Sequence, residues 1–105
     1  MNVLMPDDLL ELYTTGYSKP YKEIVRNPRL YEGFHRAVEA MMVAENVEQL
    51  KQFSYLHYEQ LRYQYAGKSS VRLCNGYVHR LLFTESENGI ELKLVEIDNT
   101  HYGNK

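Results

Sequence analysis

The sequence predicts an α+β domain in which two or three N-terminal helices pack on one face of a small antiparallel sheet. Up to residue 53 the apolar residues recur at helical spacing, and after residue 67 they alternate with polar residues as in strands. Two Asn-Gly pairs, at 75–76 and 88–89, are hairpin-turn signals that separate segments of strand length. Helices followed by an antiparallel meander are typical of the α+β class, and 105 residues fit a single domain, residues 1–105.

The first expected elements are a short strand and a helix. Residues 3–5 form the candidate strand, and Asp7 or Asp8 is the candidate N-cap of the helix that follows. Gly16 stands where this helix is expected to end, because glycine adopts the left-handed conformation of a helix C-terminus without steric cost. Residues 17–26 are expected to form a polar connection.

The apolar stripe within residues 28–53 predicts one broken helix or two consecutive helices. Asn27-Pro28 is a strong start signal, since asparagine caps free N–H groups and proline at the first helical position has no N–H to leave unsatisfied. Asn46 and Gln49 have the spacing of a capping box, which predicts that the helix restarts there. The methionine and aromatic residues of the stripe are assigned to the core.

Three strands are predicted after residue 67. The first ends near Cys74, the second covers residues 77–84 and the third covers residues 90–97. A strict two-residue turn in the first hairpin would pair Arg80 with Val71 and separate Arg72 from Arg80. A three-residue loop pairs Ser70 with Arg80 and Leu73 with Tyr77 instead.

The second register is favoured because burying an unpaired arginine among aliphatic side chains is costly. The solvent-facing side of the hairpin then carries Lys68, Ser70, Arg72, Val78 and Arg80. The opposite face is aliphatic and available to the helices. His79 is expected on the helix side or at the edge, in a structural role.

The composition says more about the cellular location of the protein than about whether it binds nucleic acid. The 12 Lys and Arg against 14 Asp and Glu give a pI near 6.1, which is unusual for a nucleic-acid-binding domain. Residues 1–50 hold five basic and eight acidic residues and residues 51–105 hold seven and six, so any positive patch must be local and C-terminal. With one cysteine, no apolar run of membrane-spanning length and no signal-peptide pattern, the expected location is the cytoplasm.

Five stretches in order along the chain share a pattern with one family. They are LYTTG at 12–16, LHYEQL at 56–61, SVRL at 70–73, HRLLF at 79–83 and EIDNTHYG at 96–103. Together they resemble the toxins of the RelE/ParE superfamily, and most of all the HigB-like branch, with its "LHxExL" stretch and C-terminal His-Tyr pair. The chain departs from that pattern in a longer spacing between Arg72 and Arg80, and in Arg62-Tyr63 where Lys-Gly is common.

The resemblance implies a RelE-like fold and a toxin that cleaves mRNA in the ribosomal A site without a cofactor. It also implies a cognate antitoxin that forms a hetero-oligomer with the toxin. Such cleavage needs a proton acceptor for the 2′-OH, cations for the charge on the phosphate and a proton donor for the leaving oxygen. Arginine suits the phosphate and histidine suits either proton transfer.

The expected catalytic residues are therefore Arg72, Arg80, His101 and Tyr102. Lys68, Ser70 and His57 are the expected substrate-binding residues, although the sequence alone favours a structural role for His57 over a second proton carrier. The sequence does not assign acid and base among these groups. It contains no spaced Cys/His set, so no metal site is expected.

Two other functions fit the same fold. A ParE-like toxin would bind and inhibit DNA gyrase without cutting RNA, and a catalytically inactive relative would serve as an interaction module, which the acidic pI favours. The His101-Tyr102 tail beside paired arginines favours the nuclease, since a gyrase binder does not need it.

Overall fold

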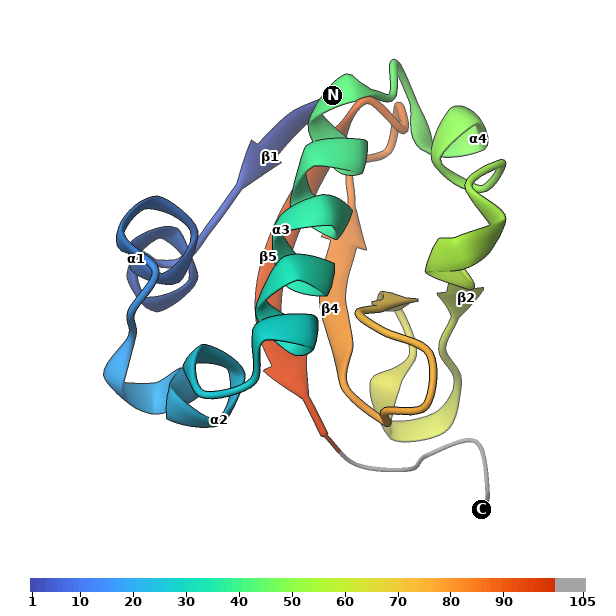
Figure 1. Cartoon of the computed structure of the whole chain (residues 1–105). Coiled ribbons are helices and arrows are strands. Elements are labelled where there is room, and N and C mark those ends of the chain that lie inside the picture. The colour runs from blue at the N-terminus through green and yellow to red at the C-terminus, as the bar shows by residue number, and fades with distance from the viewer. Residues whose placement is uncertain (100–105) are drawn as a thin grey trace.

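Five strands form one sheet in the order β1-β5-β4-β3-β2, with β1 parallel to β5 and every other pair antiparallel. This computed structural model describes residues 1–63 and 65–99 and the backbone of residue 64. The strands are β1 (Asn2–Leu4), β2 (Glu59–Gln60), β3 (Ser69–Arg72), β4 (Arg80–Glu85) and β5 (Glu91–Asp98). The α-helices are α1 (Asp7–Thr15), α2 (Lys22–Val25), α3 (Pro28–Val43) and α4 (Val47–Leu50). Figure 1 shows α3 lying across the sheet, which confirms the predicted α+β arrangement.

The first helix begins and ends through different signals. Gly16 closes α1 at φ +80°, and its N–H donates to the carbonyl oxygen of Leu12 at 3.1 Å, as predicted. The predicted N-cap is wrong, because the cap position is Pro6 and no side chain caps the helix. Asp7 and Asp8 instead lie inside the first turn, where carboxylates interact favourably with the helix dipole.

The connection after α1 is more ordered than predicted. Residues 17–26 include a 3-10 helix (Lys19–Tyr21) and α2 rather than only polar loop. Ile24 is 2% exposed and joins the hydrophobic core. The polar composition of residues 17–26 did not indicate that Ile24 would pack into the core.

Residues 28–53 contain two consecutive helices rather than one broken helix. The Asn27 Oδ1 accepts hydrogen bonds from the backbone N–H groups of Arg29 at 3.1 Å and Leu30 at 3.3 Å, so the predicted cap is confirmed. At the second start, Asn46 Oδ1 accepts from Gln49 N at 2.9 Å. The Gln49 side chain accepts from Glu45 N at 2.8 Å, one residue earlier than in a standard capping box.

The core lies between α3 and the inner face of the sheet. Gly33 allows the closest approach, because a Cβ placed on it would lie 1.9 Å from the carbonyl oxygen of Leu73. Further along the interface the fully buried side chains are Phe34, Val38 and Met41 on α3 and Val71, Leu81 and Phe83 on the sheet.

The register of the β3–β4 hairpin differs from the predicted one by two residues. Arg72 pairs with Arg80 and Ser70 with Leu82, so the predicted pairs of Ser70 with Arg80 and Leu73 with Tyr77 are wrong. Tyr77 and His79 belong to a wide connection, in which Tyr77 N donates to Cys74 O at 3.3 Å. A shift of two residues keeps every side chain on its face, so the predicted division of the hairpin into two faces is confirmed.

Contacts with the helices explain the wide connection. The His79 Nε2 lies 2.9 Å from Glu23 Oε1 on α2, and the Arg29 guanidinium lies 5.8 Å from the centre of the Tyr77 ring. These contacts hold Tyr77 and His79 towards the helices and delay the start of β4 to Arg80. His79 is 7% exposed, on the helix side as expected.

Candidate active site

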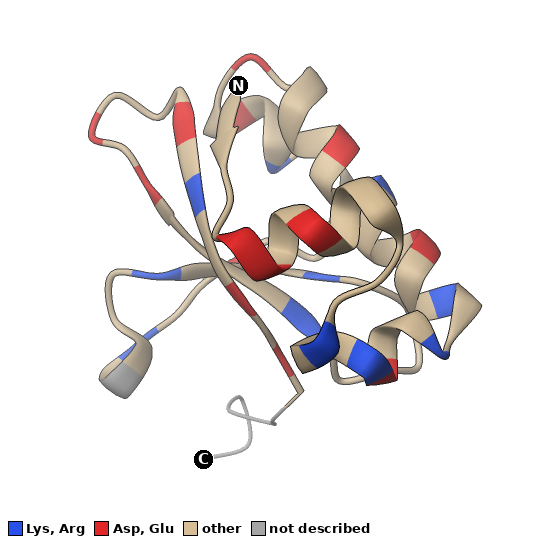
Figure 2. Ribbon diagram, turned by 90° about the vertical axis from the view of Figure 1, so that its left-hand side faces the viewer, with Lys and Arg blue, Asp and Glu red and all other residues tan. Residues whose placement is uncertain are grey.

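Arg72 and Arg80 lie directly opposite each other on neighbouring strands, on the face of the sheet away from the helices. Their strand neighbours Val71 and Leu81 are fully buried against the helices, and successive side chains of a strand point to opposite faces. Figure 2 shows the helices gathered on one side of the sheet. Like charges directly opposite each other are unfavourable unless an anion lies between or beside them. Two guanidinium groups on one face also supply the forked N–H donors that bind phosphate.

Glu59 supplies one carboxylate to this pair. Its Oε1 lies 2.9 Å from Arg80 Nη1, and its side chain is 53% exposed while that of Arg80 is 16% exposed. Strand β2 positions Glu59 by pairing it with Ser70, the residue two before Arg72. The sequence predictions did not include Glu59, although it is the acidic residue of the LHYEQL stretch.

Two hollows meet at the arginines. One, of about 300 Å³, is lined by His57, Tyr58, Glu59, Arg72 and Arg80. The other, of about 240 Å³, is lined by Arg72, Gly76, Tyr77, Val78 and Arg80. An extended ligand that crosses both hollows would pass over the two guanidinium groups.

The stretch of sequence that contains the arginines is basic although the chain as a whole is acidic. Residues 60–84 contain four Lys and Arg and no Asp or Glu. Figure 2 shows acidic segments on the helices, in the connection between β4 and β5 and along β5. Residues 60–84 are thus basic in sequence, whereas Glu59 contacts Arg80 and Asp98 is the strand partner of Arg80 on β5.

The other predicted site residues are distributed around this centre. His57 is exposed and lines the hollow with Glu59, and its backbone has φ +50°. Ser70 lies on the arginine face but is 1% exposed, so little of it can meet a ligand. His101 and Tyr102 lie outside the described residues.

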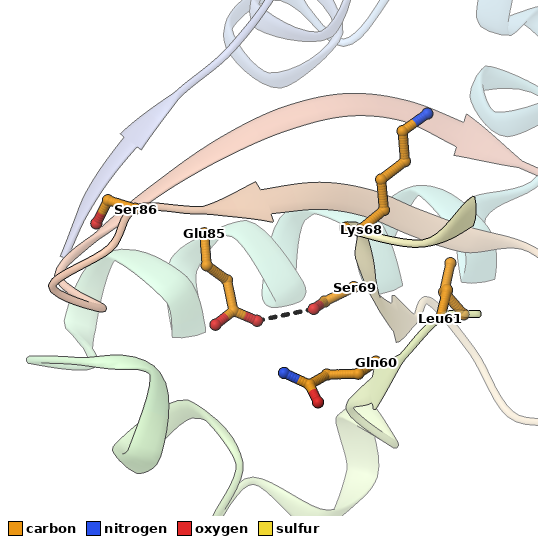
Figure 3. Close-up of a pocket in the computed structure, with 7 residues that line it drawn as sticks. Gln60, Leu61, Lys68, Ser69, Glu85 and Ser86 are labelled. Carbon is orange, nitrogen blue, oxygen red and sulfur yellow. Dashed lines mark hydrogen bonds between the residues drawn. The ribbon is translucent and has the colours of Figure 1, made fainter. Parts of the chain in front are cut away.

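Lys68 lies at the rim of a separate hollow of about 400 Å³ at the edge of β3, together with Gln60, Ser69 and Glu85. Figure 3 shows that Lys68 points to one side of the sheet while Ser69 and Glu85 point to the other. The structure therefore places Lys68 beside the arginine face but not among the residues that line the two arginine hollows.

A hydrogen-bonded network of three side chains lies on the helix side of that edge. The Glu85 Oε2 accepts from Ser69 Oγ at 2.7 Å and from the Tyr58 hydroxyl. The pKa of Tyr58 is raised to about 12. Burial is the larger cause, and the hydrogen bond to the Glu85 carboxylate is the next. The network fixes the segment just before β2 to the end of β4, and so it supports the position of Glu59.

Tyr58→Phe should destabilise the fold by about 1–3 kcal/mol, because it removes a hydroxyl bonded to a carboxylate. The wild type should lose stability as pH rises from 10 towards 12, since the unfolded tyrosine ionises near 10 and the folded one only near 12. Chemical unfolding at pH 7 and at pH 11 would measure both effects. The variant should lose less stability over that interval than the wild type, and an equal loss would contradict the assigned role.

Two features are absent from residues 1–63 and 65–99. Among these residues, no group of three or more His, Cys, Asp or Glu side chains is arranged to hold a metal ion. None of the helices that they form is long and apolar enough to cross a membrane.

Several solved structures superpose on this chain over nearly its whole length. A YoeB/ParE toxin from Agrobacterium tumefaciens superposes with a TM-score of 0.53 at 15% sequence identity, over 96% of this chain and 100% of that chain. This chain has the RelE/ParE toxin fold. YoeB from Staphylococcus aureus shares it, with a TM-score of 0.51 at 17% identity in the structure of the YoeB dimer, over 97% of this chain and 98% of that chain.

YoeB in the S. aureus YoeB–YefM complex matches this fold at a TM-score of 0.50 and 18% identity, over 97% of this chain and 98% of that chain. No protein-family model and no curated protein matches the sequence significantly. At these identities the RelE/ParE fold is what the structures share. The HigB-like branch stays a prediction, since the matching structures carry the names YoeB and YoeB/ParE.

Proposed function

We propose that this chain is the toxin of a toxin–antitoxin module and that it cleaves mRNA bound in the ribosomal A site. The observation that carries the proposal is the position of Arg72 beside Arg80, with the Glu59 carboxylate 2.9 Å from Arg80, on the face of the sheet opposite α3. This cluster contains a phosphate-binding pair and a proton acceptor, two of the three groups that metal-independent RNA cleavage needs.

In the proposed reaction the 2′-oxygen attacks the adjacent phosphorus while the bond from phosphorus to the 5′-oxygen breaks. Glu59 accepts the proton of the 2′-OH, and Arg72 and Arg80 stabilise the charge on the phosphate oxygens as it grows. The products are a 2′,3′-cyclic phosphate and a 5′-OH, so no water and no cofactor is consumed.

The third group, an acid for the 5′-oxygen, is assigned to the tail. Strand β5 ends at Asp98, which pairs with Arg80 in the sheet. His101 follows only three residues later, and three residues span at most about 11 Å. We therefore assign the proton donor to His101 and a supporting contact to Tyr102, with His57 and Lys68 contacting the substrate.

The partner of the toxin is proposed to be a cognate antitoxin encoded with it. A matched solved structure is a heterotetrameric complex of YoeB with the antitoxin YefM, which supports a hetero-oligomer here as well. The same proposal treats residues 1–105 as one toxin domain and implies a cytoplasmic location, where ribosomes are found.

Mapping transcript ends in growing cells tests this function. Induction of the wild type should arrest growth and produce new mRNA ends within codons. The double variant His101→Ala/Tyr102→Ala should leave transcripts intact and restore growth. Arrested growth with intact transcripts would instead support the ParE-like alternative, which is inhibition of DNA gyrase. One of the matched structures is named a YoeB/ParE toxin, which is why this alternative is retained.

A further inference from the structure

Tyr63 combines an exposed ring with an unfavourable backbone conformation. Its φ is +60°, in the left-handed region that residues with a Cβ rarely adopt, and the residue is 90% exposed. Packing does not compensate this conformation, since the ring meets solvent on nearly all sides. Residues held in such conformations concentrate at functional sites, which points to a contact outside the chain.

The residue with this strain is joined to the candidate active site through β2. The other non-glycine residue with positive φ in the described part of the chain is His57, which lines the arginine hollow. His57 and Tyr63 lie just before and just after β2, the two-residue strand that places Glu59 on Arg80. The connection from β2 to β3, residues 61–68, therefore begins two residues after Glu59.

The charge of this connection identifies the class of ligand. Arg62 is exposed beside Tyr63, and Lys68 is partly exposed at the end of the connection, where its carbonyl accepts from Leu61 N at 2.9 Å. The connection holds no acidic residue. Figure 2 shows that it extends from the sheet on the side away from the helices. An exposed ring between two cations suits a ligand with flat apolar faces and phosphates.

We propose that Tyr63 stacks on a nucleobase while Arg62 and Lys68 contact neighbouring phosphates, so that residues 61–68 form a second RNA contact beside the cleavage site. This inference rests on the proposed function and extends it to a part of the ribosome–mRNA substrate outside the cleaved bond. An acidic protein surface would satisfy the two cations but would leave the ring without a flat partner.

Binding without cleavage separates this contact from the chemistry. The probe is bacterial ribosomes programmed with an mRNA whose A-site codon carries 2′-O-methyl groups, which block attack by the 2′-oxygen. Tyr63→Ala and Tyr63→Leu should raise the Kd roughly fivefold or more, the range expected for loss of one stacked base. Tyr63→Phe should bind as the wild type does, and so should the control Tyr17→Ala, which removes a 48% exposed tyrosine after α1.

Tyr63→Gly distinguishes a binding role from a structural one. Glycine adopts positive φ freely, so this variant should melt at a higher temperature than the wild type while it binds the programmed ribosomes more weakly. If Tyr63→Ala binds the programmed ribosomes as tightly as the wild type does, the proposal is overturned. This holds even if the variant binds the antitoxin less well, because Tyr63 would then contact the antitoxin instead of RNA. A loss in Tyr63→Phe equal to that in Tyr63→Ala would also overturn it, because it would indicate a hydroxyl contact.

These measurements also separate failure of the Tyr63 contact from failure of the proposed nuclease function. If the wild type cleaves unmodified mRNA on ribosomes and Tyr63→Ala binds normally, the stacking contact fails and the nuclease stands. If the wild type does not bind programmed ribosomes, both fail together.

Discussion

Arg80→Ala should reduce the rate of mRNA cleavage on ribosomes by roughly 100- to 1000-fold, the usual effect of removing one group that stabilises charge in a transition state. Arg80 is the residue that contacts Glu59 at 2.9 Å and lines both hollows, so its loss affects the phosphate and the proton acceptor together. The rate should be measured in single turnover at saturating protein, which removes differences in binding.

Two variants control this prediction. Arg26→Ala removes an exposed arginine at the end of α2 and should leave the rate unchanged. Arg80→Lys keeps the charge without the fork of donors and should give an intermediate rate. Since residues that act as a unit are not additive, Arg72→Ala/Arg80→Ala should be little slower than the slower single variant. Wild-type cleavage by Arg80→Ala would rule out the paired arginines as the phosphate site.

Gly33→Ala should destabilise the fold by about 3 kcal/mol or more, the upper range for overpacking. The new methyl group would lie 1.9 Å from the carbonyl oxygen of Leu73 and 2.7 Å from its carbonyl carbon. These are backbone atoms, so no side chain can rotate to make room, and α3 must move away from the end of β3. The clash outweighs the gain of about 1 kcal/mol in helix propensity that alanine offers over glycine.

Urea unfolding would measure this effect, with Glu32→Ala as the matched control. Glu32 is the exposed neighbour of Gly33 in the same helix, and its replacement should change stability by less than about 0.5 kcal/mol. Equal stability of Gly33→Ala and the wild type would show that α3 and β3 are not packed as closely as described.

The starts of α3 and α4 were predictable because each depends on local chemistry. Asn27 and Asn46 cap the N–H groups two or three residues ahead of them, and no distant residue is involved. The two faces of the β3–β4 hairpin were predictable for a similar reason. An arginine does not pack among aliphatic side chains, whatever the length of the turn.

The hairpin register was not predictable, because contacts from other elements decide it. The Asn75-Gly76 pair indicated a tight turn, but His79 binds Glu23 and Tyr77 packs against Arg29, both on helices far away in the sequence. Ile24 in α2 and the two-residue strand β2 depend on tertiary contacts in the same way.

Glu59 was missed for the same physical reason. The sequence showed that Arg72 and Arg80 share a face, but Glu59 joins them only because β2 pairs with β3 at Ser70. A carboxylate near two facing arginines reduces the repulsion between their like charges, and LHYEQL holds the nearest acidic residue before β3.

The central claim is that Glu59, Arg72 and Arg80 act together on one phosphodiester, and the chemistry of the cut ends tests it most directly. Purified protein should be incubated with ribosomes carrying a defined mRNA, and the new ends should be identified for the wild type and for Glu59→Gln. The expected ends are a 2′,3′-cyclic phosphate and a 5′-OH from the wild type, with formation at least roughly 100-fold slower in Glu59→Gln. Ends with a 3′-OH and a 5′-phosphate, or equal rates for the two proteins, would contradict attack by the 2′-oxygen at this site.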